Sequence, residues 1–81
     1  MTALDEIQAM IGRKITAARE RMGMRQGELA RKTNLAPSTI SRLERGICGQ
    51  PRVDTLVRIG WVTRTEPGEL LPTLKEVYET L

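Results

Sequence analysis

Histidine and phenylalanine are absent from this 81-residue chain, and cysteine occurs once, at Cys48. A single cysteine cannot close an internal disulfide, and a chain without histidine cannot build a Cys/His zinc site or a Cys/His catalytic pair. The residues that are present offer no catalytic dyad, metal cluster or phosphate-binding glycine loop. We therefore expect no enzyme activity, no metal and no cofactor.

Aromatic residues are scarce, since Trp61 and Tyr78 are the only two. The stacking platforms of proteins that bind single-stranded nucleic acid use several aromatic rings, so this class is not expected. No apolar run approaches the roughly 18 residues that a membrane span needs. The N-terminal residues 1–6 lack the basic and apolar segments of a secretion signal. We expect a cytoplasmic protein that does not enter a membrane.

Positive charge is concentrated in the middle of the chain. The formal net charge is only +3, but segment 13–58 has eleven Lys or Arg residues against four acidic ones and carries +7, while the two ends together carry −4. Ten of the thirteen basic residues are arginine, whose guanidinium forms paired hydrogen bonds with phosphate or guanine. On charge alone, a nucleic-acid-binding surface and a solvated surface of mixed charge remain equally open. A chain of this length forms one small domain.

Apolar residues recur at helical spacing and nowhere alternate with polar residues over the length of a strand, which predicts an all-α fold. Ile11, Ile15, Ala18 and Met22 form one face of a first helix, which Gly23 can end. We expect four further helices, over 28–33, 37–45, 53–59 and 67–71.

Turn and tail residues complete this pattern. Asn34 tolerates positive φ and suits a tight turn, Pro37 can open the third helix, and Gly46 can end it. The tail shows a further apolar face made of Leu74, Val77, Tyr78 and Leu81. A helix this short is not stable alone in water, so we expect that face to be covered by the domain or by a second subunit.

Residues 26–45, QGELARKTNLAPSTISRLER, form the most informative segment. The segment predicts a helix, a three-residue turn and a second helix, with the small Ala30 where the two helices cross. Such an arrangement leaves the second helix on the surface, where it can enter a DNA major groove. With Q-x-x-L-A, S-T-I-S-R-L-E-R-G and a downstream T-L-x-x-I in this order, the chain resembles the lambda-repressor/Cro-like (XRE-type) helix-turn-helix family.

The resemblance runs from about Ile11 to Leu71 and implies a compact five-helix domain over 11–71. Residues 1–10 would be an arm or the start of the first helix, and residues 72–81 a tail with a short packing or dimer helix. The resemblance implies a sequence-specific regulator of transcription, such as a repressor. It would bind a near-palindromic site in double-stranded DNA as a homodimer, at the nucleoid of a prokaryote or on phage DNA.

The resemblance also assigns roles to residues of the helix-turn-helix. The positions facing the groove, with Arg42 as the strongest candidate for reading a base, are Ala36, Pro37, Ser38, Ser41 and Arg42. The candidates for phosphate contacts are Arg25, Gln26, Thr39, Arg45 and Arg52. The alternative for Arg42 is a solvated arginine at a helix end, and the alternative for both serines is a role in capping the helix.

Two further expectations concern stability. Arg19 and Glu44 correspond to a structural ion pair between the first and third helices, and removing one partner of such a pair, if enclosed, costs about 3–5 kcal/mol. Arg25 stands where Ser, Thr or Asn commonly caps the second helix, so we expect that cap to be missing. Thr63 and Thr65 replace residues that are usually apolar in the family, which leaves the packing near the last helix open.

The sequence leaves the assembly and one functional alternative open. Trp61 is a candidate for either a dimer contact or internal packing, and Leu74 and Tyr78 are further candidates for dimer contacts. The acidic ends and the amphipathic tail also permit a protein-interaction module, such as an antitoxin or an adaptor, whose main partner is another protein.

Overall fold

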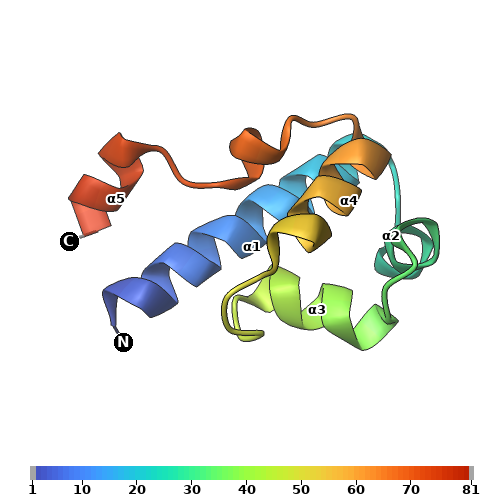
Figure 1. Cartoon of the computed structure of the whole chain (residues 1–81), viewed down its shortest axis with the longest axis horizontal. Coiled ribbons are helices and arrows are strands. Elements are labelled where there is room, and N and C mark those ends of the chain that lie inside the picture. The colour runs from blue at the N-terminus through green and yellow to red at the C-terminus, as the bar shows by residue number, and fades with distance from the viewer. Residues whose placement is uncertain (1, 81) are drawn as a thin grey trace.

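The computed structural model describes residues 2–80, which form six helices and no strand (Figure 1). Five are α-helices and one is a 3₁₀ helix: α1 (Ala3–Arg21), α2 (Gln26–Thr33), α3 (Pro37–Arg45), α4 (Val53–Thr63), η1 (Pro67–Leu70) and α5 (Leu74–Thr80). The predicted all-α fold is confirmed. Residues 3–10 belong to α1, so the segment that the sequence left as an arm or a helix start is helical.

The longest helix, α1, runs through the middle of the molecule (Figure 1). In this view α3 packs below α1, while α4 and η1 pack above it, and α2 at the right contacts both α3 and α4. The tail helix α5 lies beside α1 near both chain ends. Within residues 2–80, no helix combines the length and the apolar character that crossing a membrane requires.

The core takes one large aliphatic side chain from each of the five elements that precede the tail. Ile15, Leu29, Ile40 and Ile59 are fully buried on α1 to α4, and Leu70 of η1 is almost fully buried. Burial of each such side chain stabilises the fold by about 1.5–3 kcal/mol. The five side chains come from five elements and belong to one hydrophobic cluster, so detaching any one element would expose the cluster to solvent.

Two glycines allow α1 and α3 to approach closely. A Cβ atom on Gly12 of α1 would lie 2.5 Å from the Glu44 carbonyl oxygen and 2.6 Å from that of Leu43. Gly46 ends α3 with φ of 71°, and a Cβ atom there would lie 2.8 Å from the Cα atom of Ala9. The α1–α3 crossing therefore requires residues without side chains on both helices.

The structure departs from the sequence expectation at Met22. Met22 was expected on the core face of the first helix, but it is exposed because the helix ends there and Met22 is its C-cap. Val53 and Val57 belong to the fourth helix as predicted, and both are exposed, since this helix packs through its other face.

The fifth helix of the family pattern is a single 3₁₀ turn, η1, and the threonines before it are part of the packing. Thr63 and Thr65 are both buried. The Thr63 hydroxyl donates to the Ile59 carbonyl at 2.7 Å, and the Thr65 hydroxyl donates to the Thr63 carbonyl at 3.2 Å. These internal hydrogen bonds satisfy the hydroxyls, so threonine can stand at positions that are usually apolar.

The tail helix α5 rests on α1 beside an ion pair. The Lys14 ammonium lies 3.1 Å from the Glu76 carboxylate, and Val77 of the predicted apolar face is half-buried. Leu74 and Tyr78 of that face remain exposed in the single chain, and their coverage by a second subunit stays a prediction. Leu81, the fourth residue of the predicted face, lies outside the described residues.

We predict that Gly12→Ala lowers the free energy of unfolding by about 1–3 kcal/mol, because the added methyl group overlaps backbone atoms of α3 that cannot move without shifting the helix. Gly27→Ala is the matched control: Gly27 is also helical, but nothing lies within 4 Å of a Cβ atom built there. This variant should be at least as stable as the wild type. Urea unfolding followed by circular dichroism measures both, and equal stabilities would contradict the close approach.

Candidate nucleic-acid interface

Helix α3 has one face in the core and one face in solvent. Ile40 and Leu43 are buried, whereas Pro37, Ser38 and Arg42 are exposed. Pro37 occupies the first turn, where its missing N–H costs nothing, and Ala36 before it is extended and exposed. The helix is thus held from the inside while its outer side chains remain accessible.

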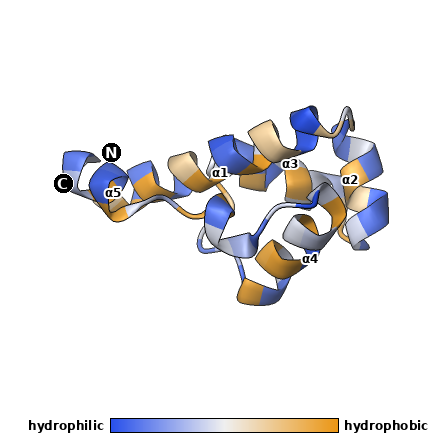
Figure 2. Ribbon diagram, turned by 90° about the horizontal axis from the view of Figure 1, so that it is seen from above, coloured by the Kyte–Doolittle hydropathy of each residue, from blue (hydrophilic) through white to orange (hydrophobic). Residues whose placement is uncertain are grey.

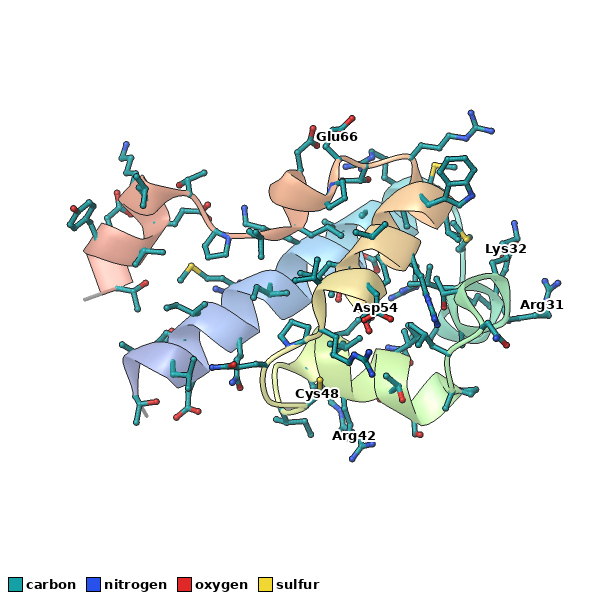
Figure 3. The ribbon with its side chains drawn as sticks, viewed as in Figure 1. Arg31, Lys32, Arg42, Cys48, Asp54 and Glu66 are labelled. Atoms are coloured by element: carbon teal, nitrogen blue, oxygen red, sulfur yellow. The ribbon has the colours of Figure 1, made fainter. Side chains whose placement is uncertain are left out.

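The polar side chains of this outer face have no internal partners. Within residues 2–80, neither the Arg42 guanidinium nor the hydroxyls of Ser38 and Ser41 form a hydrogen bond or an ion pair with another residue. Arg42 extends away from α3 at the lower edge of the molecule (Figure 3). The hydroxyls of Ser38 and Ser41 therefore do not act as caps within the described residues, and Ala36, the N-cap residue of α3, makes no side-chain cap bond. The face therefore offers free donors and acceptors to a ligand.

A buried carboxylate fixes how α3 sits on the neighbouring helices. Arg19 of α1 binds Glu44 through two hydrogen bonds, Nε to Oε2 at 2.6 Å and NH2 to Oε1 at 3.0 Å. Arg19 also donates through NH1 to the Met24 carbonyl at 2.8 Å. Gln26, the first residue of α2, donates its amide to Glu44 Oε1 at 2.9 Å. One carboxylate thereby joins α1, α2 and α3.

The electrostatics of this cluster favour the charged form of Glu44. The side chains of Glu44 and Arg19 are only 5% and 13% exposed. Burial by itself would raise the pKa of Glu44, but the hydrogen bonds from Arg19 and Gln26 outweigh it and hold the pKa below its usual value of 4.5. The same hydrogen bond raises the pKa of Arg19 above its ordinary value. The pair stays ionised at neutral pH.

The comparison with known protein families agrees with this geometry. The helix-turn-helix family matches the chain over residues 15–70, which is more than half of its length. The chain belongs to this family. Its helix-turn-helix consists of α2, the turn at residues 34–36 and α3, and the domain is of the lambda-repressor-like type found in DNA-binding regulators. Among curated proteins, none matches the chain with significant similarity.

The residues predicted to contact phosphate lie in different surroundings around the helix-turn-helix. Arg25 is exposed at the N-cap of α2 and makes no side-chain cap bond, so the expected absence of that cap is confirmed. Thr39 is half-buried on α3. Arg45 Nε lies 3.4 Å from the Ser41 carbonyl, and Arg52 pairs with Asp54 at 3.1 Å while remaining 83% exposed. An exposed pair of this kind is weak enough for a phosphate to compete with it.

Gln26 has a structural role that sequence reasoning missed. Its phosphate contact remains a prediction, but its amide is already bound to Glu44, so it also ties the start of α2 to α3. A glutamine at this position can bond to many acceptors, and the carboxylate it meets lies 18 residues further along the chain. No local pattern in the sequence shows that Glu44 is the acceptor for the Gln26 amide.

The predicted dimer contacts lie outside the helix-turn-helix. Trp61 is 85% exposed on α4, so the internal-packing alternative for this residue is wrong. Leu74 and Tyr78 are exposed on α5. All three side chains are accessible to a partner, and their participation in a dimer stays a prediction.

We predict that Glu44→Gln destabilises the fold by about 3 kcal/mol at pH 7, because it leaves the Arg19 charge without its carboxylate while Arg19 keeps the bond to Met24. The pKa of Glu44 is lower in the folded than in the unfolded chain, so its stabilisation is fully present above pH 4.5 and is lost as the pH falls through the folded value. The stability difference between wild type and variant should therefore shrink below that pH.

Glu79→Gln is the control for this prediction, because Glu79 is exposed and has no ion-pair partner within residues 2–80. It should leave the free energy of unfolding and its pH dependence nearly unchanged. Chemical unfolding at several pH values between 3 and 7, where ~1 kcal/mol differences are readily measured, tests both variants. A difference between wild type and Glu44→Gln that does not change with pH would argue against the charged pair.

Proposed function

We propose that this chain regulates transcription by binding a specific site in double-stranded DNA, with α3 in the major groove. The observation that carries the proposal is the outer face of α3, where Arg42 and the two serine hydroxyls are accessible and have no partner among residues 2–80. Ile40 and Leu43 hold the helix in the core. Membership of the helix-turn-helix family supports it.

The chemistry of this face suits the edges of base pairs. Arg42 can donate two parallel hydrogen bonds to the O6 and N7 atoms of a guanine, which is the commonest specific contact in the major groove. Ser38 and Ser41 can donate to or accept from a base or a phosphate. Ala36 and Pro37 offer only small apolar surfaces, which fit beside a thymine methyl group.

Groups around this face are suited to the DNA backbone. The first N–H groups of α2 have no capping side chain, and the positive end of the helix dipole favours an anion there. Arg25, Gln26 and Thr39 would contact phosphate near these N–H groups, and Arg45 and Arg52 would contact it beyond the end of α3. A homodimer would place two such faces one DNA turn apart, at about 34–36 Å, on a near-palindromic operator.

A protein-interaction module of the antitoxin or adaptor kind is the second candidate, and the exposed Trp61 favours a protein contact of some sort. The two candidates differ in what α3 does. A regulator needs Arg42 for selectivity between DNA sequences, whereas a pure interaction module has no such need.

We predict that Arg42→Ala weakens binding to the preferred DNA site by about 1–3 kcal/mol and relaxes the base preference at one position of each half-site. The preferred site is first selected from a random pool of duplexes. Arg31→Ala is the matched control, since Arg31 is an exposed arginine of α2 that extends toward a different edge of the molecule (Figure 3). Equal losses in both variants, or an unchanged base preference, would contradict the reading role.

We predict that DNA affinity falls steeply with salt, with a log–log slope of about −0.9 for each phosphate that is neutralised. Arg25, Arg45 and Arg52 in two subunits would together give a slope of about −5. Arg52→Ala should make the slope less steep and should weaken binding to all DNA sequences by a similar factor. Fluorescence anisotropy from low to moderate salt measures the affinity and its slope. No DNA binding at low salt, beside tight binding of a protein, would favour the interaction module.

A further inference from the structure

One helix of this small domain exposes an apolar face that its fold does not use. Val53, Val57 and Trp61 of α4 are all exposed, and their spacing of four residues places them along one side of the helix. Figure 2 shows hydrophobic segments along α4 at the edge of the molecule. We call these three residues the α4 ridge. Contiguous exposed apolar surface of this kind marks an interaction site.

The indole of Trp61 stands between two hollows. An open hollow of about 830 Å³ lies between α4 and η1, lined among others by Trp61, Gly60 and Pro67. A second hollow of about 360 Å³ lies between α4 and α2, where Val57, Trp61 and Asn34 line it. The larger hollow falls in the range of about 300–1,000 Å³ that accommodates small molecules, so it can take an aromatic side chain. The surface thus presents a projecting ring beside a space of suitable size.

Charges of opposite sign border this surface. Lys32 and Arg64 contribute basic groups to the lining of the larger hollow, and Glu66 and Glu69 contribute acidic ones. Within residues 2–80, Arg64, Glu66 and Glu69 have no ion-pair partner, whereas Lys32 pairs with Glu28. This surface has basic and acidic groups beside one projecting ring. A two-fold rotation can therefore place the basic groups of one copy against the acidic groups of a second copy.

We propose that two copies of this chain pair through the α4 ridge. The Trp61 indole of each copy enters the hollow between α4 and η1 of the other, and Arg64 of each copy faces Glu66 and Glu69 of the other. The proposal deepens the proposed function, because it names the surface that would join two DNA-reading units. The residues that line the two hollows do not include any residue of α3, so pairing leaves the reading face uncovered.

A stable dimer would bury about 800 Å² on each partner, which is about 15% of the 5351 Å² surface of this chain. A tryptophan contributes about 150–250 Å² when it is buried, and tryptophan is the side chain most often found to dominate binding. Most of the remaining area would come from Val57, Pro67 and the charged borders.

Sedimentation equilibrium of the full chain without DNA tests the proposal. We expect the wild type to dimerise and Trp61→Ala to weaken the dimer by at least about 30-fold. Leu4→Ala is the matched control, because Leu4 is an exposed apolar side chain, 46% exposed, in the first turn of α1 at the end of the molecule away from α4 (Figure 1). It should leave the dimer unchanged. A monomeric wild type, a dimer that survives Trp61→Ala, or an equal loss in Leu4→Ala would overturn the proposal.

Charge-reversed variants test the two-fold arrangement without altering the core. Arg64→Asp makes the border wholly acidic near η1, and aspartate tolerates the positive φ of 54° at this position. Glu66→Lys combined with Glu69→Lys makes it basic. Each variant alone should dimerise about tenfold more weakly, and a mixture of the two should form heterodimers of near wild-type affinity. If the mixture pairs no better than either variant alone, the arrangement is wrong.

A DNA titration separates this proposal from the proposed function. Trp61→Ala should keep the affinity of the wild type for a single half-site and lose the extra affinity for two adjacent half-sites. A chain that dimerises through Trp61 but binds no DNA would refute the regulatory function and leave the interface standing. A chain that binds DNA selectively through Arg42, yet dimerises as tightly when Trp61 is alanine, would refute only the interface.

Discussion

The carboxylate of Glu44 is the point where α1 and the two helices of the helix-turn-helix, α2 and α3, meet. The carboxylate accepts hydrogen bonds from Arg19 of α1 and from Gln26 of α2. The backbone carbonyl of the same residue lies against Gly12 of α1. A buried charge is tolerated only where donors surround it, so this group favours the one arrangement of helices that supplies them. The close backbone approach at Gly12 adds a steric condition to the electrostatic one.

The same interaction explains why α3 can devote its outer face to a ligand. Helix α3 owes its position to Ile40 and Leu43 in the core and to Glu44 near its end, so its exposed side chains contribute little to stability. Arg42 can therefore stay without a partner among the described residues, while Arg58 on α4 pairs with Asp54. An arginine without an internal partner can give all its donors to a base or phosphate. The fold thus depends on one side of this short helix, and the other side is the one that we propose for DNA recognition.

Much of the fold was accessible from the sequence because the signals are local. The positive φ of Asn34, the end of α3 at Gly46 and the start of α3 at Pro37 follow from the conformational preferences of these residue types. The missing cap at Arg25 follows in the same way. Met22 was placed wrongly, because helical spacing predicts a face but cannot tell at which residue the helix leaves the core.

The sequence by itself determined the approximate positions of the helices, the turns and the set of side chains that face outward on α3, because these depend on residues a few positions apart. Only the tertiary structure decided that Gln26 binds Glu44, that Gly12 must lack a side chain, that Thr63 can be buried, and that Trp61 projects from α4. Each of these depends on which distant element lies opposite the residue. A linear pattern of residue types does not show which elements lie opposite each other, because the packing of the helices around a common core decides this.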